Sequence, residues 1–274
     1  MYQPKVMIIE EIIPEAPQVK TFRLRFQDPA EREGFTFRAG QFGEFSLFGE
    51  GEGAFCLTSS PIRKSFLEFT IKGVDRVTKA FHKLDPGDLI GFRGPYGNWF
   101  PIEAFKGSNL IFIGSETGLI PLRPLILNCL DVREYFGQLT ILYGAKSVTD
   151  LLYKREIERW EKRGDLTLIK TVDSGGDEPG WNGRVGLVPV VMREMGPSAH
   201  NCFAIAGGPP DMIKFAILGL ETMGFPSDRI MVSLPMKMKC GLGKCGQCRI
   251  GKYSVCKDGP VFTYTQLFQF PNEW

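Results

Sequence analysis

The amino-acid sequence predicts a multidomain protein of the β plus α/β class. We expect an antiparallel β-barrel over residues 1–105, an α/β domain with a parallel sheet over residues 106–233, and a small C-terminal module over residues 234–274. Three observations support this fold class. Apolar and polar residues alternate in the first hundred residues, apolar runs without alternation follow, and four cysteines crowd one short stretch near the C-terminus.

The barrel is predicted from residues that alternate with period two. Phe22, Leu24 and Phe26 alternate with polar residues between Val19 and Phe26, and the segment from Leu67 to Lys72 has the same pattern. This period is typical of half-buried strands. Gly and Pro pairs between the apolar segments indicate tight turns. Together these patterns favour a small antiparallel barrel or sandwich.

The second domain is predicted from apolar strands that alternate with helical segments. The strands are expected at residues 109–114, 138–144, 166–172 and 202–207. Amphipathic helices are expected over residues 150–164, where Tyr153, Ile157 and Trp160 share one face, and over residues 211–224. Apolar strands of this kind are typical of a parallel sheet. The carboxyl ends of its strands would form the ligand crevice.

The C-terminal cysteines have the spacing of a metal-cluster loop. Cys240, Cys245, Cys248 and Cys256 are spaced C-x4-C-x2-C-x7-C, and the first three match the plant-type spacing for a two-iron two-sulfur cluster. Four thiolates also suit structural zinc, which stays the alternative, although zinc ribbons more often use two separate C-x2-C pairs. A disulfide framework is the least favoured reading, because the other three cysteines are scattered through apolar segments.

Composition excludes several classes of protein. The chain has 274 residues, of which 43% are hydrophobic, and a formal net charge of +2, which gives no reason to expect a nucleic-acid partner. The N-terminus lacks a basic segment followed by a long apolar one, and nowhere do about eighteen apolar residues run together. We therefore expect no export signal, no membrane span and a location in the reducing cytoplasm, where a thiolate cluster survives.

Several short blocks, in this order, resemble one superfamily. They are Gly40-Gln41-Phe42, Phe55 to Pro61, Arg76-Val77-Thr78, Gly94-Pro95-Tyr96-Gly97, Gly207 to Met212, and the cysteine loop followed by Cys256 to Phe262. With them, essentially the whole chain resembles the ferredoxin–NADP reductase superfamily. The similar branch holds the electron-transfer subunit of dihydroorotate dehydrogenase and the gamma, or diaphorase, subunit of sulfhydrogenases.

The resemblance implies an FAD site on the barrel. Its expected residues are Phe55, Cys56, Leu57, Thr58, Ile71, Lys72, Arg76, Val77 and Thr78. Phe55 would pack against the isoalloxazine, while Cys56 stands where Ser or Thr is usual and Gly53 where an arginine commonly pairs with the diphosphate. Arg76, Val77 and Thr78 would hold the diphosphate instead, although Thr78 as a plain helix cap fits the same geometry.

The resemblance also implies a site for NAD or NADP. Its expected residues are Gly114, Ser115, Glu116, Thr117, Gly118, Gly208, Pro209 and Pro210. Ser115 and Glu116 replace two residues that are usually glycine, so the Glu116 carboxylate either points away from the nucleotide or closes the site to it. Gly207 stands where cysteine is usual. Lys146 either meets an adenosine phosphate or is an exposed loop lysine.

The implied function is electron transfer by a subunit of a larger complex. Electrons would pass between NAD(P)H, FAD and the cluster, and then to a redox partner of the hydrogenase, heterodisulfide reductase or dihydroorotate dehydrogenase type; the hydrogenase type is favoured. No catalytic acid, base or nucleophile is expected, and neither His82 nor His200 lies in a cluster.

The cysteine loop and the aromatic tail of Phe268, Phe270 and Trp274 form the predicted docking face. Alternatives are a non-catalytic relay with a closed nucleotide site and a zinc-stapled binding module.

Overall fold

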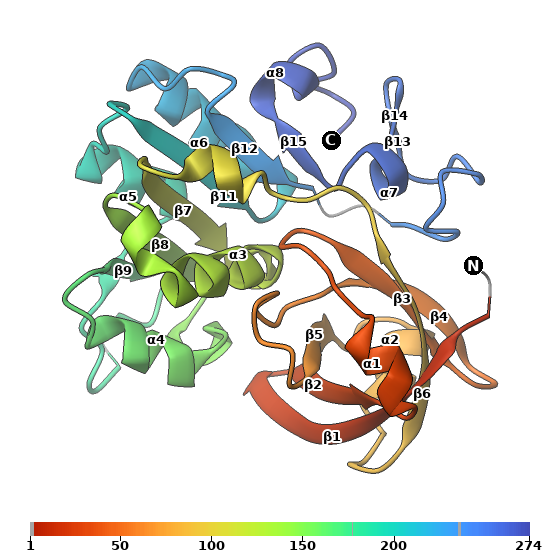
Figure 1. Ribbon diagram of the computed structural model, residues 1–274. Helices are drawn as coiled ribbons and strands as arrows, with labels where there is room; N and C mark the ends of the chain where they lie inside the picture. The colour runs from red at the N-terminus through yellow and green to blue at the C-terminus, as the bar shows by residue number, and fades with distance from the viewer. Residues whose placement is uncertain (1–2, 177, 235–236) are drawn as a thin grey trace. The chain divides into compact units, whose positions relative to one another are not determined.

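The chain forms two compact units, each built from segments that are distant in sequence. The computed structural model describes residues 3–176, 178–234 and 237–274 (Figure 1). The first unit contains Met1–Phe100, Arg123–Asn128 and Met236–Pro260, and the second contains Pro101–Leu122, Cys129–Pro235 and Val261–Trp274. The division into three domains stays a prediction, and its boundary at residue 234 adjoins residues 235–236, which lie outside the described residues.

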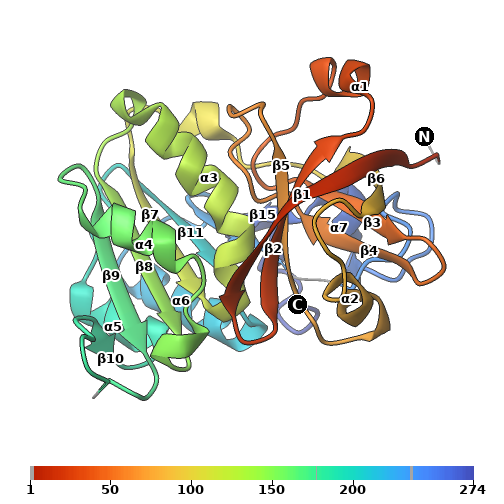
Figure 2. The same ribbon diagram turned by 90° about the horizontal axis from the view of Figure 1, so that it is seen from below.

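The first unit contains a six-stranded antiparallel sheet whose strands curve around a common core (Figure 2). Its strands are β1 (Lys5–Ala16), β2 (Val19–Phe26), β3 (Phe42–Leu47), β4 (Gly51–Cys56), β5 (Leu67–Lys72) and β6 (Leu89–Tyr96), in the order β4-β3-β6-β1-β2-β5. A bridge between Leu57 and Phe69 joins the chain after β4 to β5. The predicted barrel is therefore confirmed. Two short helices, α1 (Pro29–Glu33) and α2 (Arg76–Phe81), follow β2 and β5.

Aromatic rings fill the core of this unit. The centroids of the Phe45 and Phe69 rings are 4.1 Å apart, and those of Phe22 and Phe69 are 5.1 Å apart. The inward positions of β2 are buried, as its period-two pattern predicts. For β5 the prediction of a half-buried strand is wrong, because its polar residues Glu68 and Thr70 are also buried.

Paired hydrogen-bonding groups allow these polar residues of β5 to be buried. The Glu68 carboxylate accepts hydrogen bonds from Arg23 Nε at 2.9 Å and from Arg123 Nη1 at 2.7 Å. The Thr70 hydroxyl shares a 2.8 Å hydrogen bond with that of Thr21. A buried carboxylate is stable only when it is paired in this way. Period two alone cannot reveal such partners, since Arg123 is distant in sequence.

The second unit contains a mostly parallel sheet of seven strands. They are β7 (Asn109–Ser115), β8 (Leu139–Ala145), β9 (Thr167–Val172), β10 (Arg184–Val185), β11 (Cys202–Gly207), β12 (Ile230–Ser233) and β15 (Val261–Thr263), in the order β10-β9-β8-β7-β11-β12-β15. All neighbours are parallel except β12 and β15. The four predicted strands are confirmed, whereas β10, β12 and β15 were not predicted.

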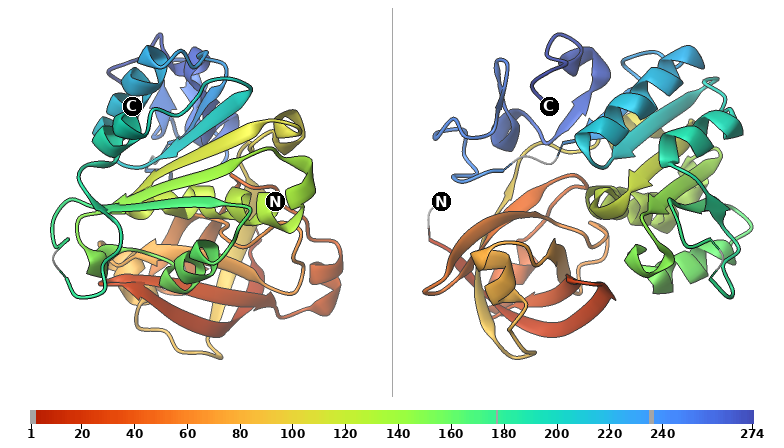
Figure 3. Two further views of the ribbon diagram at one scale, coloured as in Figure 1. Left: turned by 90° about the vertical axis from the view of Figure 1, so that its left-hand side faces the viewer. Right: turned by 180° about the vertical axis from the view of Figure 1, so that it is seen from behind.

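Helices connect the parallel strands. They are α3 (Leu119–Asp131), α4 (Lys154–Glu161), α5 (Val188–Met195) and α6 (Pro210–Thr222), and α5 and α6 pack side by side against the sheet (Figure 3). The predicted helix over residues 150–164 is shorter, because Tyr153 has a left-handed φ of 54° directly before α4. The sequence prediction missed α3, which contains Pro121 and Pro124, residues that ordinarily oppose a helix.

The remaining elements are short. The helical turns are η1 (Ile102–Phe105), η2 (Glu116–Gly118), η3 (Arg133–Tyr135) and η4 (Val148–Asp150), and near the C-terminus lie β13 (Arg249–Ile250), β14 (Tyr253–Ser254), α7 (Val255–Asp258) and α8 (Tyr264–Leu267). Among the described residues, we find no helix with both the length and the apolar character that a bilayer span requires.

Candidate functional site

The four predicted ligand cysteines lie in one loop and the helix that follows it. Cys240, Cys245 and Cys248 precede the β13–β14 hairpin, and Cys256 lies in α7. Cys248 and Cys256 are buried, whereas Cys245 is exposed. The intervening glycines have positive φ angles, 66° at Gly241 among them, which lets the loop turn around the sulfur atoms.

Backbone N–H groups of this loop point at the sulfur atoms. Leu242 N and Lys244 N donate to Cys240 Sγ at 3.4 and 3.3 Å, and Gly243 N donates to Cys256 Sγ at 3.0 Å. Burial opposes ionisation of Cys240, but hydrogen bonds from the N–H groups of Leu242, Cys245 and Lys244 and from the Cys245 thiol together outweigh it and lower the pKa of the Cys240 thiol to about 6. The loop therefore favours a thiolate at Cys240, the form that binds metal.

The thiols are arranged in two pairs. Cys240 is hydrogen-bonded to Cys245, and Cys256 is hydrogen-bonded to Cys248. Among the described residues, no three Cys, His, Asp or Glu side chains converge on the position of one metal ion. Two pairs of thiolates suit two irons, each of which takes two cysteine sulfurs. The two thiol pairs thus fit a two-iron cluster.

A buried carboxyl group, which the sequence prediction missed, lies beside this loop. Glu44 on β3 is 1% exposed, and its Oε1 accepts no hydrogen bond from any described residue. A Cβ atom added to Gly241 would lie 2.9 Å from Glu44 Oε1. Burial, reinforced by the charge of Glu52 and opposed by that of Arg93, raises the pKa of Glu44 to about 7. Period two places Glu44 on the outer face of the barrel, so the sequence alone suggests a solvated side chain.

The predicted FAD residues Phe55 and Cys56 lie at the end of β4. The Phe55 ring packs near Phe45 and Phe69, with centroid distances of 6.1 and 5.8 Å. A Cβ atom at Gly53 would lie 2.7 Å from Phe55 Cζ, so an arginine at that position would displace the ring. Burial raises the pKa of the Cys56 thiol to about 11, which keeps it a neutral, weak hydrogen-bond donor.

The other FAD residues of the strands are mostly inside the barrel. Leu57, Thr58 and Ile71 are buried, and Lys72 is exposed. Thr58 Oγ1 lies 3.5 Å from Thr70 Oγ1 and is therefore directed at a neighbouring strand. Contact between these residues and a flavin stays a prediction.

The three residues predicted to bind the diphosphate already have partners within the protein. Arg76 is exposed and pairs with Glu50 at 3.0 Å. Thr78 N donates to Asp75 Oδ1 at 2.8 Å, while Thr78 Oγ1 accepts from the N–H groups of Val74 and Asp75 at 2.9 Å each. The N-cap of α2 is thus Asp75, and Thr78 is the third helical residue of its capping box, not the plain cap that the alternative interpretation expected. An anion held by Val77 and Thr78 would compete with the Asp75 carboxylate, so the phosphate role stays a prediction.

The two predicted nucleotide turns touch each other in the second unit. Gly114 at the end of β7 is paired in register with Gly207 at the end of β11. A Cβ atom on Gly118 would lie 2.2 Å from the Gly207 carbonyl oxygen, and one on Gly207 would lie 2.4 Å from that of Gly118. A side chain at position 207 would therefore collide with the backbone of Gly118. The ends of β7 and β11 therefore offer closely packed backbone, next to Gly208, Pro209 and Pro210.

Glu116 lies in this turn and faces a lysine. It has a positive φ of 51°, a conformation that favours glycine, and its carbonyl oxygen accepts a 3.2 Å hydrogen bond from Tyr143 Oη. Lys146 Nζ lies 3.8 Å from Glu116 Oε1. Burial, and next the Glu116 charge, raise the pKa of Asp173. Lys146 is thus close to two carboxylates, and the lysine predicted to meet a phosphate is partly neutralised.

The predicted aromatic tail is only partly available for docking. Phe268 is 60% exposed. Trp274 Nε1 donates to the Leu267 carbonyl oxygen at 3.4 Å, and Lys214 Nζ lies 5.5 Å from the centre of the Trp274 ring. Trp274 therefore packs against its own unit.

His82 caps the end of α2 and His200 is exposed, and neither joins a cluster of catalytic side chains among the described residues.

The fold and these sites define an oxidoreductase built for electron transfer. Residues 112–217 match the family described as the oxidoreductase NAD-binding domain, and residues 236–268 match the iron-sulfur cluster binding domain of dihydroorotate dehydrogenase B. The chain is 38% identical over 257 residues to sulfhydrogenase 1 subunit gamma of Pyrococcus furiosus, covering 92% of this chain and 88% of that one. It is 32% identical to the probable electron transfer subunit of dihydroorotate dehydrogenase B of Methanocaldococcus jannaschii, covering 96% of this chain and 90% of that one.

Solved structures share the fold. A structure of an NADH-dependent reduced ferredoxin–NADP oxidoreductase matches all of this chain and 95% of that one with a TM-score of 0.75 and 23% identity. A ferredoxin–NADP reductase from Neisseria gonorrhoeae matches 85% of this chain and 98% of that one, with a TM-score of 0.71 and 17% identity. The chain belongs to the ferredoxin–NADP reductase superfamily, in the branch of the sulfhydrogenase gamma subunits and the electron-transfer subunits of dihydroorotate dehydrogenase B.

Proposed function

We propose that this chain is the electron-transfer flavoprotein subunit of a larger complex, moving electrons between NAD(P)H and a partner redox subunit by way of FAD and a two-iron two-sulfur cluster. The observation that carries the proposal is the cysteine loop, whose two thiol pairs occur on the same chain as a reductase barrel and a nucleotide-binding-type sheet. FAD, when bound, supplies the conversion between two-electron and one-electron transfer.

The residues of the chain bind and orient these groups rather than exchange protons with a substrate. The four cysteines would hold the irons, and the N–H groups of Leu242, Gly243 and Lys244 stabilise negative charge on the sulfur atoms. The Phe55 ring offers an apolar surface for the flavin. The neutral Cys56 thiol donates a weaker hydrogen bond than the usual hydroxyl, which would alter the flavin potential.

The test is one anaerobic preparation of the purified protein. Equal amounts of iron and acid-labile sulfide would support the cluster, and zinc in their place would contradict it. Bleaching of the flavin absorbance when NADH or NADPH is added would support the nucleotide site. The reductase function fails if neither nucleotide bleaches the flavin in protein assembled with its partner subunits.

A non-catalytic relay is the second candidate, and the geometry of Glu116 favours it. Its carboxylate lies in the turn where a diphosphate would approach, and it faces Lys146. In this case flavin and cluster would still exchange electrons, but no pyridine nucleotide would reduce the flavin. The same preparation separates the two candidates, because photoreduction of the flavin would then reduce the cluster while NADH and NADPH would not.

The partner we favour is a hydrogenase-type subunit, and the compartment we propose is the cytoplasm. The likeness to a sulfhydrogenase gamma subunit supports this partner over the dihydroorotate dehydrogenase and heterodisulfide reductase types. Anaerobic affinity purification of the tagged chain from its own cells tests the choice. Recovery of a dihydroorotate dehydrogenase subunit in place of a hydrogenase subunit would overturn it.

A further inference from the structure

Positive charge is concentrated around the cysteine loop. Residues 237–260 carry six basic side chains, all exposed, and a single acidic one, Asp258; the six are Lys237, Lys239, Lys244, Arg249, Lys252 and Lys257. The whole chain has 33 basic and 31 acidic residues, so the rest of it has 27 basic and 30 acidic ones and is net negative. We call these six side chains the basic surface.

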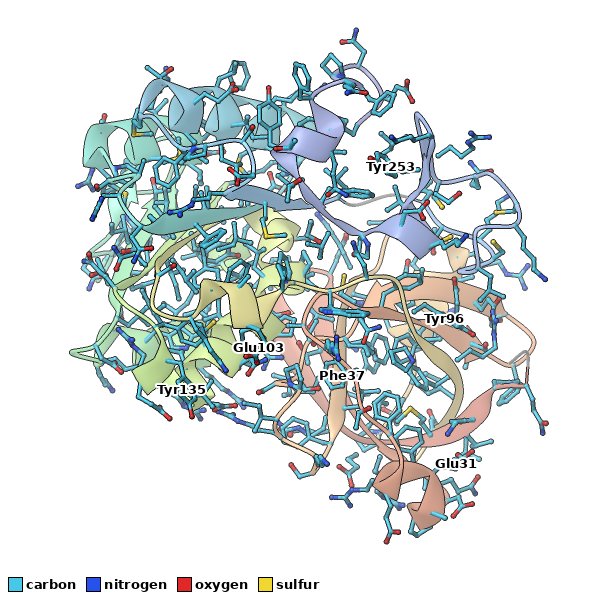
Figure 4. The ribbon with its side chains drawn as sticks, turned by 45° about the horizontal axis from the view of Figure 1, so that its top comes forward. Glu31, Phe37, Tyr96, Glu103, Tyr135 and Tyr253 are labelled. Atoms are coloured by element: carbon cyan, nitrogen blue, oxygen red, sulfur yellow. The ribbon has the colours of Figure 1, made fainter. Side chains whose placement is uncertain are left out.

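The basic surface lies directly around the thiols. Lys239 precedes Cys240, Lys244 precedes the exposed Cys245, and Lys257 follows Cys256. The Lys257 side chain runs back along the loop, because its Cδ would lie 3.2 Å from a Cβ atom on Gly243. Lys252 lies at the tip of the β13–β14 hairpin, 5.3 Å from the ring of Tyr253, which Figure 4 labels.

Three acidic groups of the same unit, Asp258, Glu44 and Glu52, are buried or have partners outside the basic surface. The Asp258 carboxylate accepts a 2.7 Å hydrogen bond from Ser254 N, and Glu44 is buried beside Gly241. Glu52 pairs with Arg93 at 2.7 Å. Within the basic surface, the charge of Lys237 is the one that lowers the pKa of Asp75. Around the exposed ligand, Cys245, exposed basic residues of this segment therefore outnumber acidic ones by six to one.

We propose that the basic surface is the docking site of an acidic redox protein, which exchanges electrons with the cluster at its Cys245 side. This proposal rests on the proposed function, because it requires that the four cysteines hold the cluster. A surface of one sign steers a partner of opposite charge and raises the association rate by roughly 10- to 1,000-fold at low salt. It also orients that partner so that its redox centre faces the most exposed cysteine ligand.

The competing explanation is that the basic residues only balance the negative charge of the cluster. In that case their removal would change the reduction potential, and it would alter the rates of all electron acceptors in the same direction. A docking surface instead changes the rates of anionic and cationic acceptors in opposite directions. Two small acceptors of opposite charge therefore separate the explanations.

The experiment uses the whole protein with its cluster loaded. The cluster is reduced by dithionite, the excess is removed, and its reoxidation at low salt is followed by stopped-flow absorbance. The acceptors are hexacyanoferrate(III), which is anionic, and a cobalt(III) hexaammine complex, which is cationic. The test variant combines Lys244→Gln, Arg249→Gln and Lys252→Gln. Because nucleotide is not used, a missing NAD(P)H reaction would contradict the reductase function but not the docking site.

The matched control removes three exposed charges of α4 in the second unit, through Lys154→Gln, Arg155→Gln and Arg159→Gln. We expect the test variant to slow the anionic acceptor by roughly tenfold and to accelerate the cationic one, with both effects lost in high salt. The control should change neither rate by more than about twofold.

A protein acceptor completes the test. Reoxidation by a small acidic two-iron ferredoxin should slow in the test variant but not in the control. Equal changes in test and control variants, or changes of the same direction for both small acceptors, would overturn the proposal. If the test variant binds too little iron, Lys237→Gln with Lys252→Gln, which are not adjacent to a cysteine in sequence, provides the same comparison.

Discussion

Replacing Glu44 with glutamine should make the cluster-free protein more stable at high pH. The carboxyl of Glu44 is 1% exposed and its pKa is raised from 4.5 to about 7. A group whose pKa is higher in the folded state binds its proton more tightly there. Its contribution to stability is full below pH 4.5 and is lost as the pH rises through 7. The glutamine is uncharged at every pH and avoids this loss.

The size of the effect follows from the shift in pKa. One pKa unit corresponds to about 1.36 kcal/mol. By linkage, the ionisable carboxyl lowers the free energy of unfolding by about 1.4 kcal/mol at pH 5.5 and by about 3.4 kcal/mol at pH 8.5, relative to a group that stays neutral. The stability advantage of Glu44→Gln should therefore grow by about 2 kcal/mol between these two pH values.

The assay is urea unfolding of both proteins without cluster, under reducing conditions, at the two pH values. Titrating groups that do not act on Glu44 are common to both proteins and cancel in the difference. Among the thiols, Cys240 does act on Glu44, as the smallest of the four causes of its shift, and leaves a correspondingly small residual. Glu33→Gln, at an exposed glutamate of α1 in the same unit, is the control and should give a pH-independent difference. An equally flat difference for Glu44→Gln, or one that falls as the pH rises, would refute the reasoning.

Three further predictions concern the other sites. Glu116→Gly should tighten binding of NADH, measured by fluorescence titration, by roughly fivefold, because a carboxylate beside a diphosphate costs about 1 kcal/mol; unchanged affinity would mean that Glu116 faces away from the nucleotide. Cys245→Ser should lower iron and sulfide content to well under half, whereas Cys202→Ser, in the second unit, should leave both unchanged; equal losses would contradict the assignment. Asp75→Ala should lower the free energy of unfolding by about 1 kcal/mol, since it removes the cap of α2; no change in the urea midpoint would argue against the cap.

The sequence predicted those parts of the fold whose signals are local. Alternation in β2 and apolar runs in β7, β8, β9 and β11 depend only on neighbouring residues, and these strands lie where they were expected. The helix α3 was missed because Pro121 and Pro124 oppose helix formation locally. Pro121 lies in the first turn, where proline is tolerated, whereas Pro124 lies inside the helix. The short strands β10, β12 and β15 give too few residues for a period to be read.

In the candidate site, too, the features with a local sequence signal could be predicted and those that depend on distant segments could not. The spacing of the four cysteines is a local signal, and the loop indeed turns its N–H groups toward the sulfur atoms. The burial of Glu44 could not be predicted, because the segment beside it lies almost two hundred residues later in the chain. The Asp75 cap on Thr78 could have been predicted from the Asp-x-x-Thr spacing, a variant of the capping box.

The discontinuity of the first unit has a consequence for how the protein is made. Its barrel strands leave the ribosome long before residues 236–260 of the same unit, which follow more than a hundred residues later. Until then the outer side of β3 lacks the loop that lies beside Glu44, and a solvated Glu44 carboxylate would suit that open face. The nascent barrel thus carries a soluble surface that becomes buried only when the cysteines arrive. The cluster can therefore form only after Cys256 has been synthesised, and fragments that stop before residue 236 would present a water-compatible barrel without a cluster.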